Sequence, residues 1–179
     1  MTKKRAAKAK INPKIHLDVG CGFNKNPGFI GMDKRAVDGV DIVHDAEDLP
    51  WPIKDESCAV IAMSHLIEHI KPWLQIDVIN ECWRVLEVGG VLAISTPYAT
   101  SFGYSQDPTH ISPWNEATPT YFWPGEPLYE VYRPKPWAKE RLWWDVKFNM
   151  EVVMRKILVQ DVDGVYFKLK KEGGADEKL

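Results

Sequence analysis

The chain has 179 residues, which suits a single domain that buries roughly 70% of the surface of its unfolded chain. Hydrophobic residues make up 45% and charged residues 27%, both ordinary for a globular protein. No apolar run reaches the ~18–20 residues that a bilayer-spanning helix needs. The N-terminus also lacks the apolar core of a signal peptide. We therefore expect neither membrane insertion nor secretion.

The net charge of −2 is unevenly distributed. Residues 1–14 hold six basic residues and no acidic one. Such an arm could contact nucleic acid. No aromatic residues alternate with the basic ones, as a base-stacking surface would want. We therefore favour a disordered, solvated arm over residues 1–12.

The three cysteines, Cys21, Cys58 and Cys82, are odd in number and form no CxxC pair. This pattern supports neither a disulfide framework nor a thiolate zinc site. We expect a cytoplasmic location, where thiols stay reduced.

The first half of the chain alternates short apolar strands with turns and one helix. A helix should start near Pro72, continue through apolar residues at helical spacing, and stop at Gly89-Gly90. This alternation predicts an α/β fold with a Rossmann-like, mostly parallel sheet. Five strands are expected, at residues 15–19, 29–33, 41–44, 58–63 and 91–95.

The second half differs in character. Residues 97–144 are rich in proline and aromatic residues, and we interpret them as a lid insertion with a short helix at 115–123. We expect most of these aromatic side chains to serve packing. Strands at 151–159 and 165–170, joined by a turn at 161–164, predict an antiparallel C-terminal hairpin. The domain would then span residues 13–172, with a polar tail at 173–179.

A glycine turn follows the first expected strand, in Leu17-Asp18-Val19-Gly20-Cys21-Gly22. Glycine has no Cβ, so the backbone can turn sharply there and a ligand can lie against it. Asp33 and Asp45 end the next two strands. The carboxyl ends of parallel strands line the ligand crevice of an open α/β sheet, and an acid in this place binds ribose hydroxyls. The pattern predicts a nucleoside-binding site.

A nicotinamide dinucleotide is the obvious rival ligand. Its fingerprint, G-x-G-x-x-G, opens a helix whose N-terminus holds the pyrophosphate. Here only Phe23 to Gly28 separate the glycine turn from the next strand, and Pro27 is among them. Six residues cannot form a crossover helix. A ligand with adenosine but no phosphate fits better.

The chain resembles the type 11 group of class I S-adenosylmethionine-dependent methyltransferases, in an abbreviated form without the first crossover helix. The resemblance implies S-adenosylmethionine as cofactor and methyl transfer as activity. It places Asp18 near the methionine amino group, Asp33 at the ribose, and Ser64 and His65 on the methionine side. Gly20 and Gly22 would give room for the ligand, while Asp45, Ala46 and Glu47 would meet the adenine. The matching stretches are LDVGCG at 17–22, FIGMD at 29–33, DIVHDAEDLPWP at 41–52, SHLIEHI at 64–70 and ECWRVLEVGGVLAISTP at 81–97.

Two histidine patterns suggest further chemistry. Asp107 and His110 follow the fifth strand, and a histidine held by a carboxylate can act as a general base. Asp107 could instead stabilise its own loop by accepting hydrogen bonds from nearby backbone N–H groups. His65 to His69 match the H-x-x-E-H pattern of zinc peptidases, but no third ligand is evident on a following helix. We expect no metal site.

Two functions remain open from the sequence. The first is an active methyltransferase whose catalytic candidates are Asp107 and His110. The second is a non-catalytic module that binds S-adenosylmethionine for a partner protein. The sequence specifies neither the methyl acceptor nor the oligomeric state.

Overall fold

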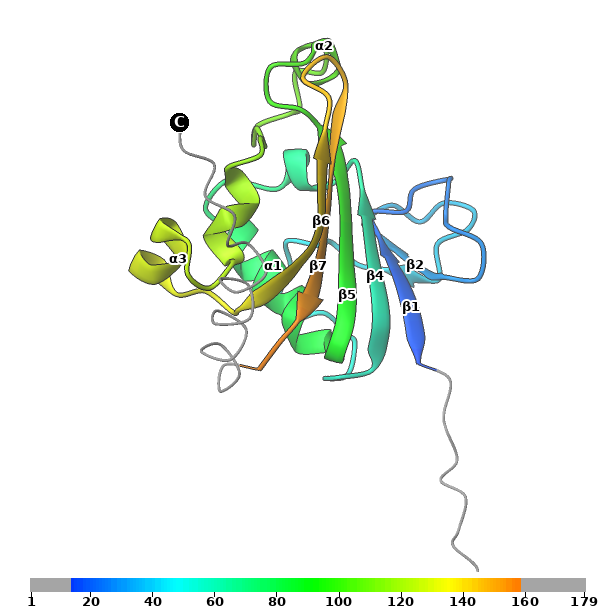
Figure 1. Cartoon of the computed structure of the whole chain (residues 1–179). Helices are drawn as coiled ribbons and strands as arrows, with labels where there is room; N and C mark the ends of the chain where they lie inside the picture. Colours follow the sequence, from blue (N-terminus) through cyan, green and yellow to red (C-terminus); the bar gives the residue numbers. More distant parts are fainter. Residues whose placement is uncertain (1–13, 159–179) are drawn as a thin grey trace, which may run out of the picture.

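The structure is a computed structural model and describes residues 14–158. Its centre is one seven-stranded sheet in the order β3-β2-β1-β4-β5-β7-β6 (Figure 1). The first five strands run parallel and the last two antiparallel to their neighbours, which confirms the predicted Rossmann-like fold class. The strands are β1 (Ile15–Val19), β2 (Ile30–Asp33), β3 (Ile42–Val43), β4 (Cys58–Ser64), β5 (Leu86–Pro97), β6 (Trp137–Trp144) and β7 (Asn149–Lys156).

The connection from β1 to β2 contains turns and no helix, as the sequence predicts. Leu17 pairs with Ile30 and Val19 with Met32, so the two strands lie in direct parallel register. Leu17, Val19 and Met32 are fully buried and tie this edge of the sheet to the core. The carboxyl ends of β1 and β2 are therefore fixed side by side without a crossover helix between them.

The helix after β4 is shorter than expected. A 3-10 helix, η1 (Ile67–His69), comes first, and α1 spans Gln75–Val85. Gly89 and Gly90 do not end the helix but lie within β5, which starts at Leu86. The pairing of β5 with β4 shifts register in this region, and Gly89 adopts a φ of 80°. The glycine pair therefore marks an irregularity in a strand rather than a helix stop.

The predicted pairing of the strand at 151–159 with a strand at 165–170 was wrong. β7 pairs with β6 on one side and with β5 on the other, so both of its edges are occupied. The hairpin is antiparallel as expected, but its first strand comes from the segment interpreted as a lid. The proposed strand at 165–170, the basic arm at 1–12 and the polar tail at 173–179 lie outside the described residues.

Three short helical elements fill the segment between β5 and β6: α2 (Phe102–Ser105), η2 (Thr118–Phe122) and α3 (Pro127–Tyr132). The helix expected at 115–123 is thus a single 3-10 element. Five aromatic residues in the second half of the chain are at most 5% exposed and therefore serve packing, whereas Trp143 and Trp144 are 49% and 41% exposed. The five are Trp114, Phe122, Trp123, Tyr129 and Trp137.

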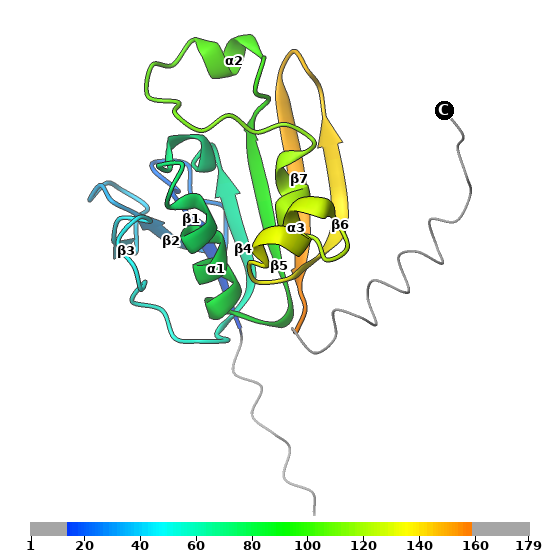
Figure 2. The same ribbon diagram turned by 90° about the vertical axis from the view of Figure 1, so that its left-hand side faces the viewer.

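The described helices α1 and α3 lie on the same face of the sheet (Figures 1 and 2). Burial follows this arrangement, because alternate residues of β5 and β7 are buried and those between them are partly exposed. Leu92, Ile94, Val152 and Met154 belong to the buried set. Among residues 14–158, no helix combines the length and apolar character needed to cross a membrane.

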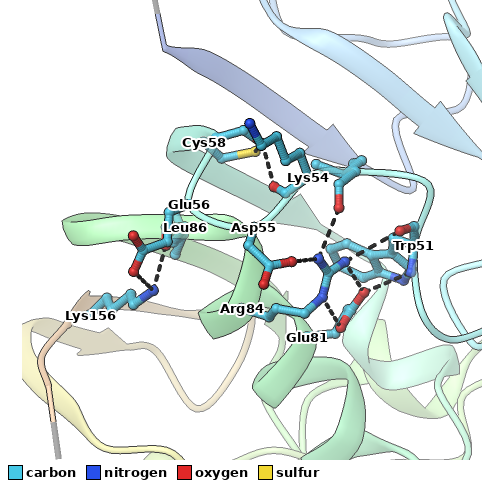
Figure 3. Close-up of polar contacts among 11 residues, drawn as sticks. Trp51, Lys54, Asp55, Glu56, Cys58, Glu81, Arg84, Leu86 and Lys156 are labelled. Atoms are coloured by element: carbon cyan, nitrogen blue, oxygen red, sulfur yellow. Dashed lines mark hydrogen bonds and ion pairs between the residues drawn. The ribbon is translucent and has the colours of Figure 1, made fainter.

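A polar network anchors the loop after β3 to α1 (Figure 3). The Arg84 guanidinium donates to Glu81 through Nε at 2.8 Å and to the Ile53 carbonyl at 2.9 Å. Glu81, only 7% exposed, also accepts from the backbone N–H of Trp51 at 2.7 Å. The hydrogen bonds that Arg84 donates to the Glu81 carboxylate raise the pKa of Arg84. The network fixes the segment that leads from β3 into β4.

Candidate active site

A cavity of about 600 Å³ opens at the carboxyl ends of the parallel strands. This is where an open α/β sheet binds its ligands. Its walls carry both acidic and basic side chains, so it suits a ligand with charges of both signs. The lining residues are Gly20, Met32, Asp33, Lys34, Arg35, His44, Asp45, Ala46, Glu47, His65, Leu66, His69, Ile70, Lys71, Thr109 and Ile111.

The glycine turn forms one wall of this cavity. Gly20 and Gly22 adopt φ values of 73° and 50°, which an L side chain rarely accepts. The Gly20 N–H donates to the Met32 carbonyl at 2.7 Å, and the Gly22 N–H donates to Asp33 Oδ2 at 2.9 Å. Gly20 lines the cavity, whereas Gly22 does not and instead fixes the Asp33 carboxylate through its N–H.

Asp18 is not among the lining residues. Its carboxylate is 2% exposed, and its Oδ2 accepts from the backbone N–H of Asn26 at 2.7 Å and from the Asn26 amide at 2.8 Å. These bonds tie the connection after the glycine turn to β1. The structure therefore gives Asp18 an anchoring contact, and its expected contact with the methionine amino group remains a prediction.

Asp33 lies at the end of β2 and faces the cavity. Its Oδ1 accepts from the Arg35 backbone N–H at 2.9 Å and from Arg35 Nε at 3.2 Å. Burial alone would raise the pKa of Asp33, but the hydrogen bonds from Arg35 and Gly22 outweigh it and lower the pKa. Asp33 is therefore ionised at neutral pH and able to accept hydrogen bonds from a ligand.

The three residues expected at the adenine also line the cavity. Asp45 Oδ1 accepts from the Glu47 N–H at 3.0 Å, and the Ala46 carbonyl accepts from the Trp51 indole at 3.0 Å. Glu47 forms an ion pair with Lys71 and accepts from its backbone N–H at 2.8 Å. The segment after β3 is thus held from two sides.

At the end of β4, Ser64 is exposed and does not line the cavity, whereas His65 does. His65 has a φ of 51°, a conformation that costs a non-glycine residue energy. Its N–H donates to the Ser95 carbonyl at 2.8 Å. The Glu68 carboxylate, with Oε1 3.3 Å from His65 Nδ1, raises the pKa of His65. His65 precedes η1, so it does not share an α-helical face with His69 as the zinc-peptidase pattern would require.

The loop after β5 brings Thr109 and Ile111 to the cavity. Asp107 Oδ1 accepts from the Thr109 N–H at 2.8 Å and from its hydroxyl at 2.7 Å. These bonds lower the pKa of Asp107. Asp107 Oδ2 lies 3.7 Å from His110 Nε2, beyond hydrogen-bond distance, while His110 Nδ1 lies 2.9 Å from the Tyr104 carbonyl. The Tyr104 carbonyl, rather than Asp107, therefore orients the His110 ring.

Sequence reasoning missed several residues that line the cavity, among them Arg35, Leu66, His69 and Lys71. Arg35 and Lys71 could have been found from the sequence, because each is a cation that can pair with an acidic residue expected at the site. Arg35 pairs with Asp33 and Lys71 with Glu47. Leu66 had none, because its position depends on how the chain before η1 packs against the glycine turn. His69 had a signal only as part of the zinc-peptidase pattern.

A matched glycine pair tests whether the ligand lies against the turn. Gly20→Ala should cost about 1 kcal/mol or more of stability because of its positive φ, and its Cβ would also lie 2.9 Å from Leu66 Cδ1. Gly28→Ala carries the same backbone penalty at a φ of 80°, but its Cβ would meet nothing within 4 Å. We expect only Gly20→Ala to weaken adenosylhomocysteine binding in calorimetry. Equal affinities for the two folded variants would place the ligand elsewhere.

The chain therefore combines a Rossmann-like sheet with a cavity at the carboxyl ends of its strands. A family model described as a methyltransferase domain matches residues 21–94. Over these residues the chain is similar to the class I S-adenosylmethionine-dependent methyltransferases of the type 11 group.

Individual relatives agree with this assignment. A probable S-adenosylmethionine-dependent methyltransferase of Mycolicibacterium smegmatis is 30% identical over 115 residues, which are 55% of this chain and 44% of that protein. The chain thus spans less than half the length of this curated relative.

Two solved structures share the fold. A SAM-dependent methyltransferase from Archaeoglobus fulgidus aligns with a TM-score of 0.60 at 15% identity, over 80% of this chain and 86% of that one. The 1,6-didemethyltoxoflavin-N1-methyltransferase of Burkholderia thailandensis, solved with bound 1,6-didemethyltoxoflavin and S-adenosylhomocysteine, aligns with a TM-score of 0.59 at 10% identity. That alignment covers 82% of this chain and 72% of the other.

Proposed function

We infer that this protein transfers a methyl group from S-adenosylmethionine to an acceptor bound beside the loop after β5. The carrying observation is the cavity itself, in which an ionised Asp33 faces the space beside a glycine turn that no helix follows. Without a helix N-terminus at the turn, the backbone there offers no helix dipole to hold a pyrophosphate. An adenosine ligand without phosphates matches the donors and acceptors present.

In this arrangement Asp33 accepts hydrogen bonds from the ribose hydroxyls, and the segment Asp45–Glu47 lies at the adenine. His65 and Gly20 lie toward the methionine part of the cofactor. S-adenosylmethionine supplies an electrophilic methyl group when bound. The protein's part in such a reaction is to align the acceptor and accept its proton. His110 is the candidate proton acceptor, because its Nδ1–H is held by Tyr104 and its Nε2 carries the free lone pair of the neutral ring.

Calorimetric titration with S-adenosylmethionine, S-adenosylhomocysteine and NAD tests this function. We expect saturable binding of the first two and none of NAD. Preferential binding of NAD, or binding of none of the three to folded protein, would contradict the proposal.

A non-catalytic cofactor-binding module remains the second candidate. The observation that favours it is the partial exposure of one face of the sheet, on which the described residues place no helix. A partner could cover that face. Release of adenosylhomocysteine from S-adenosylmethionine by the purified protein would separate the active enzyme from the module.

We also propose that the protein works in a reducing compartment such as the cytoplasm. Cys21, Cys58 and Cys82 are all buried free thiols. Burial is the largest cause that raises the pKa of each of them, which keeps them protonated and unreactive.

A further inference from the structure

Three potential metal ligands meet beside the cavity: Glu68, His69 and His110. One nitrogen or oxygen atom of each lies within 4.8 Å of the others. The loop after β5 is docked there by its backbone, because the N–H groups of Ile111 and Ser112 donate to the Glu68 carbonyl at 2.9 and 3.1 Å. This docking brings His110 to η1, and the two imidazole rings lie 4.7 Å apart between centroids.

The Glu68 carboxylate is fully buried at 0% exposure. Its Oε2 accepts from the Thr96 hydroxyl at 3.0 Å. Its Oε1 accepts no well-aligned hydrogen bond among the described residues, and His65 Nδ1 lies 3.3 Å from it. A buried carboxylate oxygen without a well-aligned donor is costly, so this position favours a cation.

Both histidines present a free nitrogen in their neutral form. His69 Nδ1 faces the Thr109 carbonyl at 3.2 Å and the Thr109 hydroxyl at 3.1 Å. That hydroxyl already donates to Asp107, so His69 Nδ1 must carry the hydrogen. His110 Nδ1 likewise donates to the Tyr104 carbonyl at 2.9 Å. Backbone carbonyls that fix an imidazole in this way leave Nε2 as the ligand atom, as they do for metal-bound histidines.

We propose that Glu68, His69 and His110 bind a divalent transition metal ion such as Zn²⁺. Two imidazoles and one carboxylate form a donor set that Zn²⁺ accepts in sites that keep a further coordination position open. Zinc bonds of about 2.1 Å place tetrahedral ligands roughly 3.4 Å apart. The ligand atoms lie within 4.8 Å of one another, so they need to close by at most about 1.4 Å, which rotation about the χ torsions can supply. This site departs from the expectation of no metal, and it does not use the His65–His69 pair of the peptidase pattern.

The open coordination position could bind the methyl acceptor, an inference that rests on the proposed methyl transfer. His69 lines the cavity, so an ion held there is reachable from inside it. It would favour an acceptor that offers an oxygen donor, such as a hydroxyl or carboxylate group. While the ion is bound, His110 Nε2 is a ligand and not a base, so the two roles of His110 exclude each other.

The rival explanation for the buried carboxylate is an ion pair with His65, whose Nδ1 lies 3.3 Å from Glu68 Oε1. An ion pair of this kind needs no metal and leaves His69 and His110 without a role in holding Glu68. The two explanations differ in what His69 and His110 variants do to metal binding.

The test is titration of the full chain, stripped with chelator, with Zn²⁺ in calorimetry and with Co²⁺ followed by its visible absorption. We expect one ion per chain. Glu68→Gln, His69→Gln and His110→Gln should each weaken metal binding by at least about 100-fold. Removing only a residue that hydrogen-bonds to a metal ligand already costs up to about 100-fold. His44→Gln is the matched control, because His44 lines the same cavity outside this group and should leave metal affinity unchanged.

Absence of saturable binding, or equal affinity in His69→Gln and wild type, would overturn the site. His69 is partly exposed, so this variant keeps the test decisive if the Glu68 variant fails to fold. Adenosylhomocysteine binding is measured on the same samples without metal. If that binding persists while metal binding is absent, only the metal site fails; if the reverse holds, the proposed methyl transfer fails.

Discussion

Asp33→Ala should weaken adenosylhomocysteine binding by about 10- to 150-fold, the equivalent of the ~1.5–3 kcal/mol of a hydrogen bond to a charged group. The carboxylate is 7% exposed and lines the cavity at the end of β2. Ribose hydroxyls would take the place of Arg35 Nε, which now lies 3.2 Å from Asp33 Oδ1. The Arg35 side chain is 57% exposed, so it can swing aside at little cost. Calorimetry on the folded variant measures the effect.

Two control variants separate the ribose contact from other consequences of the change. Arg35→Ala keeps the carboxylate and removes its competitor, so it should bind adenosylhomocysteine at least as tightly as the wild type. Asp38→Ala removes an exposed charge from the same loop outside the cavity and should change nothing. Wild-type affinity in Asp33→Ala, with the circular dichroism spectrum unchanged, would remove Asp33 from the cofactor site.

The acidic positions of the cavity were predictable because parallel strands end at a common edge. Asp33 is the last residue of β2, and Asp45 follows β3. Both therefore lie at that edge and line the cavity. Asp18 follows the same sequence pattern, yet Asn26 engages its carboxylate. That contact depends on how the connection after the glycine turn folds back, which strand periodicity does not encode.

The sequence misplaced the last hairpin for a different reason. β6 lies at the edge of the sheet, and most of its residues are at least partly exposed. An edge strand of this kind shows little of the regular alternation that indicates a strand. Its tryptophans made Trp137–Trp144 resemble part of a lid. β7 alternates between buried and partly exposed residues, and its position was predicted to within two or three residues.

His69 and His110 illustrate what no local pattern could provide. They are 41 positions apart in the sequence. They meet because the Glu68 carbonyl accepts hydrogen bonds from two backbone N–H groups of the loop after β5. The sequence favoured Asp107 as the partner of His110 because the two are close along the chain. In the structure Asp107 caps Thr109 instead, which was the structural alternative for that residue.

His110→Ala should lower methyl transfer by about 10²- to 10⁴-fold, the usual contribution of a positioned general acid or base, and leave adenosylhomocysteine affinity unchanged. The ring is held by the Tyr104 carbonyl at 2.9 Å, with its side chain only 8% exposed, so its Nε2 has a defined direction. Turnover is followed as adenosylhomocysteine release, with water or a buffer nucleophile as the surrogate acceptor that takes the methyl group.

Asp107→Asn is the informative companion, because its carboxylate lies 3.7 Å from the ring and bonds Thr109 instead. It should cost less than His110→Ala, since the Tyr104 carbonyl still orients the imidazole. Repeating both assays with chelator and with Zn²⁺ separates the two roles of His110. A free base works in chelator, whereas a metal ligand requires the ion. Full turnover by His110→Ala under both conditions would leave His110 with a packing role, and loss of cofactor affinity together with turnover would indicate that the loop no longer docks on η1.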